Sequence, residues 1–406
     1  MGKYGLLGRT LGHSRSPQIH ALLGSVPYGL YECEPECVEN FLRTTDLDAM
    51  NVTIPYKKTV MPHCVKIHGA AERIGSVNTL VRREDGWHGY NTDYDGLCYL
   101  LREGGITLQG KKVLILGSGG AGVMARTVAE DLGAREIVTI SRSGEDHYDN
   151  LQKHADGEII LNTTPVGMYP NNGEAPISLE QFPHCEGVAD LIYNPLKTAL
   201  VLQAEARGIP AVGGLMMLVA QAKAAAEHFM GKALDDALVP AITKKLQGDM
   251  QNIVLIGMPG SGKTTVATAL GERLGLPVLD SDAEIVQRAG VSIPEIFESE
   301  GEDGFRHRET SVLQDLGKQT GVILSTGGGC VVRQENFSPL RQNGIVFWIC
   351  RDLAFLPTEG RPLSQITKLE TMYETRRPLY EHFSHHVIDN NGTLEETLQQ
   401  ILEVLG

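Results

Sequence analysis

The chain has 406 residues, enough for two or three domains, and its 42% hydrophobic and 21% charged residues are typical of a globular protein. A net charge of -14 argues against general nucleic-acid binding, because a protein that follows phosphates needs a basic face. Helical and strand-like patterns alternate along the chain, which favours an α/β fold class.

Seven cysteines are scattered without a C-x-x-C pair, and their odd number argues against a disulfide framework. We therefore expect reduced thiols and a cytoplasmic location. The stretch "MGKYGLLGRT" lacks the apolar core of a signal peptide, and no apolar run approaches membrane length. We expect small-molecule substrates as partners, with neither nucleic acid nor membrane, and the sequence leaves a homo-oligomer open.

Short polar motifs lie at the expected loop edges of residues 1–95. "LGHSRSPQIH" predicts a tight turn before a helix, "MNVTIPYKK" predicts a strand that ends at Pro55 and Lys57, and "IGSVNTL" and "YNTDYDG" add an amide and a carboxylate. These groups could converge on a polyhydroxylated acid, although Ser, Asn and Asp also cap ordinary turns and helices. The candidate residues are Ser14, Ser16, Lys57, Asn78 and Asp93.

A dinucleotide-binding pattern follows in residues 112–143. Lys112 to Leu116 predict a strand, the next residues match G-x-G-x-x-G, and a helix and the strand "EIVTIS" complete a βαβ unit. Arg142 stands at the end of the second strand, where an NAD site would prefer an acidic residue. A cation suits a 2′-phosphate, so the pattern favours NADP over NAD. A Rossmann-like fold without a cofactor is the alternative.

"LNTTPVGM", "ADLIYNPLKT" and "GGLMMLVAQA" complete a series of motifs that resembles shikimate 5-dehydrogenase over residues 1–245. The resemblance implies a substrate-binding domain in residues 1–95, completed by residues 215–243, and a Rossmann NADP-binding domain in residues 96–214. It implies that Lys57 and Asp93 form the catalytic pair. The substrate-binding residues that it implies are Ser14, Ser16, Thr53, Asn78, Asp93, Tyr193 and Gln221, and those for NADP(H) are Gly117, Gly119, Gly120, Ala121 and Arg142.

The sequence departs from that family after the second Rossmann strand. NADP-type members usually carry a second Arg shortly after the motif N-R-T. Here Ser141 and Ser143 flank Arg142, and Asp146 occupies the position of the second Arg. We therefore expect a weaker preference for NADP, with use of both cofactors as the alternative.

The second half of the chain opens with a phosphate loop. "NIVLIGMPGSGKTT" combines a strand, a full match to G-x-x-x-x-G-K-[ST] and the start of a helix. Backbone N–H groups around the glycines and at the helix N-terminus attract phosphate. We expect Lys263 to reach the β- and γ-phosphates of ATP and Thr264 to hold Mg²⁺. The ATP-binding residues predicted are Gly257, Gly260, Gly262, Lys263, Thr264 and Thr265.

The residues after the phosphate loop indicate the phosphate acceptor. In "PVLDSD", Asp280 and Asp282 would share one side of a strand and could serve the metal and an acceptor hydroxyl; a solvated turn is the alternative. Arg306 and Glu309 are three residues apart on a predicted helix and share a face. The three glycines in "VILSTGGGCVV" follow a strand, where a backbone must approach a ligand closely.

With "GRPLS" and "TRRPLYEHF", these motifs resemble shikimate kinase, of the nucleoside-monophosphate-kinase-like P-loop family, over residues 251–406. The resemblance implies that Asp282 is the base and that Asp280 lies near Mg²⁺. It implies that Arg306 and Arg376 bind the substrate carboxylate. It also implies that Gly328 lies nearest the substrate and that Arg361 of the lid closes on the transferred phosphoryl group.

The kinase-like part also departs from its family. Members usually carry another basic residue between the segment "WICRDL" and Arg361, where it helps to cover the adenine. Here the intervening stretch is "AFLPTEG", which is apolar and then acidic. We therefore expect a short, weakly basic lid.

Taken together, the two halves predict a fusion of consecutive enzymes. The fold class expected is α/β throughout: an N-terminal α/β substrate domain with a Rossmann domain, a linker at residues 244–251, and a P-loop α/β domain with a parallel sheet at residues 252–406. The function expected is NADPH-dependent reduction of 3-dehydroshikimate to shikimate, then ATP- and Mg²⁺-dependent phosphorylation to shikimate 3-phosphate. One alternative is a quinate-preferring dehydrogenase joined to a kinase for another small acid. The other is a non-catalytic metabolite sensor, which predicts losses at catalytic positions.

Overall fold

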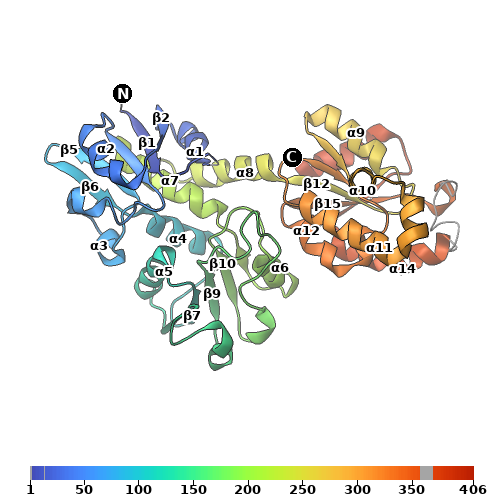
Figure 1. The fold of residues 1–406 in the computed structure, drawn as a ribbon, viewed down its shortest axis with the longest axis horizontal. Helices are drawn as coiled ribbons and strands as arrows, with labels where there is room; N and C mark the ends of the chain where they lie inside the picture. Colours follow the sequence, from blue (N-terminus) through green and yellow to red (C-terminus); the bar gives the residue numbers. More distant parts are fainter. Residues whose placement is uncertain (1, 13, 357–368) are drawn as a thin grey trace. The chain divides into compact units, whose positions relative to one another are not determined.

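The computed structural model describes residues 2–12, 14–356 and 369–406. The chain forms two compact units. Residues 1–194 and 200–246 make up the N-terminal unit, and residues 195–199 and 247–406 make up the C-terminal unit. Sheets flanked by helices occur in both units, so the predicted α/β fold class is confirmed (Figure 1).

A mixed six-stranded sheet forms the first part of the N-terminal unit, in the order β2-β1-β3-β5-β6-β4. Strand β3 ends at Val52, before the predicted end at Pro55 and Lys57, because a turn follows in which the Tyr56 N–H donates to the Thr53 carbonyl. Lys57 therefore lies beyond the strand. The elements are β1 (Tyr4–Gly8), α1 (Ser16–Leu23), β2 (Tyr28–Glu32), α2 (Val38–Thr44), β3 (Ala49–Val52), β4 (Cys64–Ile67), α3 (Ala70–Ile74), β5 (Thr79–Arg83), β6 (Gly86–Tyr90) and α4 (Thr92–Glu103).

A parallel five-stranded sheet forms the Rossmann part of the same unit, in the order β11-β10-β9-β7-β8. Its first strand, β7, has the predicted bounds, and it pairs with β8 on one side and β9 on the other. Ligands bind parallel sheets at such a reversal of strand order, beyond the carboxyl ends of the strands. The elements are β7 (Lys112–Leu116), α5 (Gly120–Asp131), β8 (Glu136–Ile140), β9 (Ile159–Asn162), β10 (Gly187–Asp190), α6 (Ala199–Ala206) and β11 (Ala211–Val212).

Helix α7 (Leu215–Met230) returns to the first sheet. Its Phe229 ring stacks on Tyr4 with centroids 5.1 Å apart, and its Ala225 joins the same apolar cluster. Helix α8 (Leu238–Met250) follows and includes most of the residues expected to form a linker. Only Gln251 separates α8 from the next strand.

The C-terminal unit is built on a fully parallel sheet in the order β13-β14-β12-β15-β16. Alternate residues of β15 enter different cores: Val346 and Trp348 pack with residues of α11, α12 and α14, whereas Phe347 and Ile349 pack with α9 and α15. The central strands are therefore covered on both faces. The elements are β12 (Asn252–Ile256), α9 (Lys263–Leu274), β13 (Val278–Asp280), α10 (Ser281–Ala289), α11 (Ile293–Leu316), β14 (Ile323–Ser325), α12 (Phe337–Arg341), β15 (Gly344–Cys350), α14 (Leu369–Phe383), β16 (His386–Asp389) and α15 (Leu394–Leu405).

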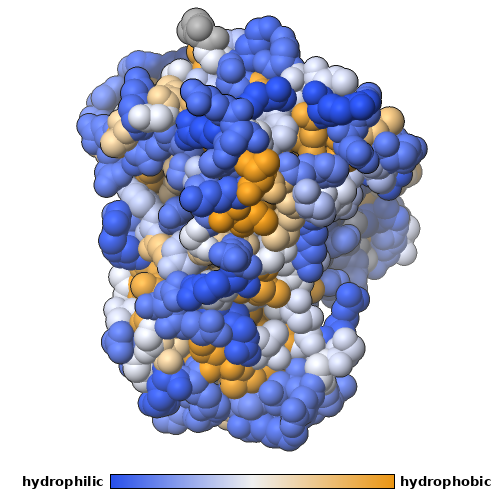
Figure 2. All heavy atoms as spheres, turned by 90° about the vertical axis from the view of Figure 1, so that its left-hand side faces the viewer, coloured by the Kyte–Doolittle hydropathy of each residue, from blue (hydrophilic) through white to orange (hydrophobic). Residues whose placement is uncertain are grey.

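The surface of the N-terminal unit is mainly hydrophilic in the view of Figure 2, with apolar side chains in separate patches between polar ones. Within the described part of the chain, no helix combines the length and the apolar character needed to span a bilayer.

Replacing Phe347 by Ala tests the packing of the C-terminal sheet. Phe347 is fully buried, so the change leaves a cavity and should lower the free energy of unfolding of this unit by about 3–5 kcal/mol. The matched control is Phe355→Ala, because Phe355 is 59% exposed and its loss should cost about 0.5 kcal/mol or less. Unfolding in urea can be followed by the fluorescence of Trp348 in chains that also carry Trp87→Phe, so that Trp348 is the one tryptophan left. Equal midpoints for the two variants would contradict the packing described.

Candidate active sites

A cavity of about 530 Å³ lies in the N-terminal unit. Its walls come from residues that follow β1, β3 and β10 and from helices α4, α5 and α7. The motifs that supply these residues are far apart in the sequence, and the fold brings them to one place. All the residues predicted for the dehydrogenase substrate and its catalysis line the cavity: Ser14, Ser16, Thr53, Lys57, Asn78, Asp93, Tyr193 and Gln221.

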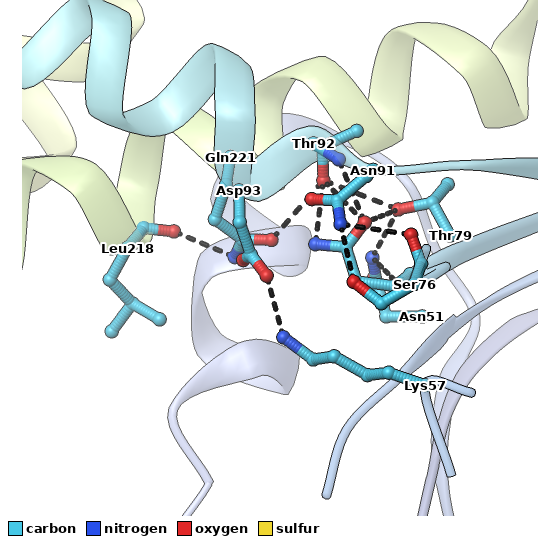
Figure 3. A network of polar contacts seen from close by, with 10 residues as sticks. Asn51, Lys57, Ser76, Thr79, Asn91, Thr92, Asp93, Leu218 and Gln221 are labelled. Atoms are coloured by element: carbon cyan, nitrogen blue, oxygen red, sulfur yellow. Dashed lines mark hydrogen bonds and ion pairs between the residues drawn. The ribbon is translucent and has the colours of Figure 1, made fainter. Parts of the chain in front are cut away.

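Lys57 and Asp93 form an ion pair at the cavity wall. The Lys57 Nζ atom lies 2.6 Å from Asp93 Oδ2, and the two side chains are 30% and 22% exposed (Figure 3). Asp93 belongs to the first turn of α4, where the helix dipole favours a carboxylate. The pair thus places a proton donor, held by a negative charge, within reach of a molecule in the cavity.

A buried polar network fixes the start of α4 and with it Asp93 (Figure 3). Asn78 Oδ1 accepts from the Thr92 N–H at 2.8 Å, and Asn78 Nδ2 donates to Thr92 Oγ1 at 3.1 Å. Thr79 Oγ1 also donates to Asn78 Oδ1, at 3.0 Å, and Asn51 Nδ2 donates to Thr79 Oγ1 at 3.2 Å. Both ends of the Asn78 amide are therefore engaged by protein groups, which makes Asn78 a support for the ion pair as well as part of the wall.

Gln221 reaches the same network from α7. Thr92 Oγ1 donates to Gln221 Oε1 at 3.4 Å, and Gln221 Nε2 donates to the Leu218 carbonyl at 2.9 Å. The helix that returns from the Rossmann part thus completes the cavity of the first sheet.

The turn between β7 and α5 has the shape that a pyrophosphate requires. A Cβ on Gly122 would lie 2.1 Å from the Gly117 carbonyl oxygen, so this close helix–strand contact needs glycine. Next to Gly119 and Gly120 there is open space, and no side chain caps the N-terminus of α5. The free N–H groups of the first turn fit the phosphates of a dinucleotide.

Arg142 is exposed just after β8. Asp146, which stands where the family has a second Arg, is turned toward another group: its Oδ1 lies 2.7 Å from His154 Nε2, and this contact lowers the pKa of the Asp146 carboxyl. The nearby acid is thus paired with His154, and Arg142 can meet a 2′-phosphate.

A second cavity, of about 890 Å³, lies in the C-terminal unit and is lined by the predicted phosphate loop. Gly257, Gly260 and Gly262 have φ values of 148°, 84° and 93°, which side chains rarely adopt. The Lys263 ammonium donates to the carbonyls of Gly257 and Met258 at 2.9 and 3.0 Å. Gly262 caps α9 without a side-chain bond, so the N–H groups of the helix start fit the phosphates of ATP.

Asp280 and Asp282 do not share the side of a strand, so that part of the sequence prediction is wrong. Strand β13 ends at Asp280, and Asp282 lies in the first turn of α10, because Asp280 Oδ1 caps this helix by accepting from the N–H groups of Asp282 and Ala283. Both carboxylates nevertheless line the cavity.

The two residues predicted to hold Mg²⁺ lie side by side in the C-terminal unit. Thr264 Oγ1 donates to Asp280 Oδ2 at 3.2 Å, which joins the two predicted metal-binding residues. No group of three or more His, Cys, Asp or Glu side chains suited to a metal occurs among the described residues. Mg²⁺ usually takes few protein oxygens and completes its shell with phosphate and water, and the oxygens of Thr264 and Asp280 fit that pattern.

Three consecutive glycines form one wall of the cavity, and each lies in close contact with a neighbouring residue. A Cβ on Gly329 would lie 2.2 Å from the Arg306 guanidinium nitrogens, one on Gly327 would lie 2.6 Å from Asp282 Oδ1, and one on Gly328 would meet the Pro259 ring at 2.6 Å. The glycines thus let the polar side chains and the phosphate loop approach one surface.

Arg306 forms a buried ion pair behind this wall. Its Nη1 donates to Glu309 Oε2 at 2.6 Å, and the side chains are 4% and 0% exposed, as their spacing on α11 predicts. Arg306 Nε and Glu309 Oε1 have no hydrogen-bond partner among the described residues. A buried donor without a partner fits a ligand that accepts hydrogen bonds.

Arg376 contributes a second guanidinium from α14. Its Nη1 donates to the Gly328 carbonyl at 3.1 Å, and the Tyr380 hydroxyl donates to the same oxygen. Arg306 and Arg376 therefore flank the glycine wall, as two groups that bind one carboxylate would.

Burial, with the nearby charges of Glu309 and Asp280, raises the pKa of Asp282 to about 6. Asp282 Oδ1 is buried without a hydrogen-bond partner in the described part of the chain. A carboxylate with a raised pKa and a free oxygen is suited to accept a proton from a bound hydroxyl near neutral pH.

Arg361 lies outside the described residues, and the other predicted kinase residues line the second cavity or belong to the phosphate loop. Phe297 and Phe305, whose stacked rings lie 4.7 Å apart, also line the second cavity. No sequence motif indicates them, because apolar residues on a helix indicate core as readily as a ligand wall. Arg351 lines the cavity as well, and no motif indicates it either.

Comparisons with known proteins divide the chain in the same way. The family model "Shikimate dehydrogenase substrate binding domain" matches residues 6–80, and the model "Shikimate kinase" matches residues 259–406. A shikimate dehydrogenase (NADP(+)) of Clostridium perfringens is 33% identical over 268 residues, covering 61% of this chain and 99% of the relative.

Two further relatives extend this result to the other half and to known structures. A shikimate kinase of Acinetobacter baylyi is 43% identical over 171 residues, covering 38% of this chain and 92% of the relative. The crystal structure of a chorismate mutase/shikimate 5-dehydrogenase fusion protein from Clostridium acetobutylicum is 35% identical, with a TM-score of 0.58, and covers 61% of this chain and 97% of that one.

Each of these curated relatives is matched over more than nine-tenths of its own length, one by each half of the chain. The chain therefore belongs to the shikimate dehydrogenase family through its N-terminal part and to the shikimate kinase family through its C-terminal part.

Proposed function

We propose that this bifunctional enzyme reduces 3-dehydroshikimate to shikimate and then phosphorylates shikimate to shikimate 3-phosphate. One observation supports the proposal most directly: each unit has its own cavity, lined both by a proton-transfer group and by residues of a predicted nucleotide-binding motif. That group is Lys57 in one unit and Asp282 in the other. The cofactors are NADP(H) for the dehydrogenase and ATP with Mg²⁺ for the kinase.

In the dehydrogenase, Lys57 donates a proton to the oxygen that was the ketone of the substrate. Asp93 holds the Lys57 ammonium in place through the 2.6 Å contact. When bound, NADPH supplies the hydride. The hydroxyls of Ser14, Ser16 and Thr53, together with Gln221, hold the carboxylate and hydroxyl groups of the substrate, and Tyr193 lies beside it.

In the kinase, Asp282 accepts the proton of the attacking shikimate hydroxyl. Arg306 and Arg376 bind the shikimate carboxylate, because planar guanidinium groups match a carboxylate in two hydrogen bonds each. Glu309 fixes Arg306. When bound, ATP supplies the phosphoryl group and Mg²⁺ offsets its charge. Lys263 contacts the phosphates, and Arg361 has the phosphoryl-contacting role that the family resemblance implies.

The two activities belong together because shikimate is the product of the first and the substrate of the second. A single chain keeps the two sites in equal number, and a covalent connection raises the effective concentration of one site around the other. Seven free thiols support a reducing compartment, as in the cytoplasm, for both reactions.

Two lysine substitutions separate the activities. Lys57→Met removes the proton donor and should lower kcat/KM for NADPH-dependent reduction of 3-dehydroshikimate by about 10²–10⁴-fold, with phosphorylation of added shikimate unchanged. Lys263→Met should lower phosphorylation by at least about 10²-fold and leave the reduction unchanged. Each variant should keep the activity that the other loses, and this retained activity is the control for intact protein in each assay. The assignment would be contradicted if the wild-type chain turned over neither substrate. It would also be contradicted if both variants kept full activity in both assays.

The raised pKa of Asp282 predicts the pH dependence of the kinase. Asp282 is protonated below pH 6 and cannot then accept the hydroxyl proton, so kcat/KM for shikimate should rise with pH through an apparent pKa near 6. Glu309→Gln removes a neighbouring negative charge and should move this midpoint to lower pH. Initial rates of phosphorylation between pH 5 and 8 at saturating ATP measure both effects. A flat profile, or a midpoint that rises in the variant, would contradict the role of Asp282.

A further inference from the structure

The second cavity contains an arginine that none of the roles above uses. Arg351 directly follows β15 and lines the cavity together with Gly262 and Lys263. Its Nε atom is buried and has no hydrogen-bond partner, and its guanidinium makes no ion pair within the described residues. An unpaired cation in a cavity built for an anionic ligand calls for a partner.

The order of the strands assigns the two sides of this cavity to different ligands. The phosphate loop follows β12, the central strand. Asp282 and the three glycines follow β13 and β14 on one side of it, where the small acid binds. Strands β15 and β16 lie on the other side. The nucleotide must therefore extend from the phosphate loop toward the segments that follow these two strands.

The segment after β16 holds Arg351 in place beside the phosphate loop. The Asn390 N–H donates to the Cys350 carbonyl at 2.8 Å, and the Asp352 N–H donates to Asn391 Oδ1 at 2.8 Å. Asn390 Nδ2 also donates to the Ser261 carbonyl at 2.6 Å. One loop thus braces both the phosphate loop and the backbone on each side of Arg351.

The guanidinium of Arg351 lies at the start of α9. A Cβ on Gly262, the residue that caps this helix, would be 4.0 Å from Arg351 Nη1. The N–H groups of the helix start and the guanidinium therefore face the same space, and both attract anions.

Two acidic side chains near this loop, Asp352 after β15 and Asp389 at the end of β16, contact Asn391. Asp389 Oδ1 accepts from the N–H and the Nδ2 of Asn391, at 3.0 and 2.8 Å, and Asp352 Oδ1 accepts from Asn391 Nδ2 at 3.4 Å. Neither carboxylate pairs with Arg351 in the described structure, so the positive charge remains available to a ligand.

We propose that Arg351 binds the α- and β-phosphates of the nucleotide. The inference rests on the proposed kinase function and adds a specific contact to it. Arg351 supplies positive charge on the nucleoside side of the phosphate loop, and the sequence "AFLPTEG" shortly after it contains no basic residue. Its planar fork can meet two phosphate oxygens at once, whereas Lys263 acts as a point charge.

The α- and β-phosphates stay with the nucleotide that leaves, so the contact forms with ADP as well as with ATP and its main effect is expected on nucleotide binding. Loss of such a contact raises Kd and KM for the nucleotide and leaves kcat nearly unchanged. This split distinguishes Arg351 from Lys263, whose loss lowers kcat.

Isothermal titration of the full chain with Mg·ADP tests the proposal. Arg351→Ala should raise Kd about 10- to 100-fold, the loss expected for a charge-assisted hydrogen bond, and Arg351→Lys should raise it less. KM for ATP should rise in parallel, with kcat within about twofold of wild type. The matched control is Arg273→Ala, since Arg273 is an exposed arginine of α9 that pairs with Glu395 and does not line the cavity; its Kd should stay at the wild-type value.

The outcomes separate this inference from the proposed function. If wild type does not bind Mg·ADP, the kinase proposal fails and the role of Arg351 fails with it. If wild type binds and Lys263→Met binds more weakly, but Arg351→Ala stays within about twofold of wild type, only the role of Arg351 is overturned. Should Arg351→Ala unfold the C-terminal unit, Arg351→Gln keeps most of the side chain without its charge, and wild-type affinity in that variant overturns the proposal.

Discussion

A strand covered on both faces has no place for a reactive polar side chain, and this constraint decides where the chemistry of the chain lies. In the C-terminal unit, successive residues of β15 pack into cores on opposite faces, so the functional groups follow the strands: the phosphate loop follows β12 and Arg351 follows β15. In the N-terminal unit, Gly117 follows β7 and Tyr193 follows β10. Both cavities therefore open at carboxyl ends of parallel strands, although the two units perform different reactions.

Local sequence patterns are sufficient to predict the functional groups that lie within one motif. The strand β7, the phosphate loop and the pair of Arg306 and Glu309 could all be predicted, because strand alternation, glycine spacing and helix periodicity are short-range properties. The brace between Asn390 and Ser261 could not, because it joins residues 129 positions apart that the sheet brings together. The shared strand face predicted for Asp280 and Asp282 is wrong, because Asp280 caps helix α10. Its capping bonds to the N–H groups of Asp282 and Ala283 place Asp282 in the helix.

The cavity of the C-terminal unit contains buried charged side chains, and their burial lowers the stability of the folded chain. Asp282 ionises near pH 6 in the folded chain instead of near its usual 3.8, and this difference removes about 3 kcal/mol of stability above pH 6, since the unfolded chain ionises more readily. The buried pair of Arg306 and Glu309 also carries a desolvation cost, because replacing both partners of such a pair by packed apolar residues is often neutral or stabilising by about 1–4 kcal/mol. A bound acid offers Arg306 the acceptor that its free Nε lacks. Under the proposed function, this stability is exchanged for a site that binds and deprotonates a hydroxy acid.

The proposed function requires one chain to perform two consecutive reactions on the same molecule. The most direct measurement supplies 3-dehydroshikimate, ATP and Mg²⁺ with NADPH that carries deuterium in place of the transferred hydride, and identifies the products by mass spectrometry. The account predicts shikimate 3-phosphate that contains deuterium, formed only when both nucleotides are present. Deuterated shikimate that accumulates without phosphate, or no transfer of deuterium at all, would contradict it.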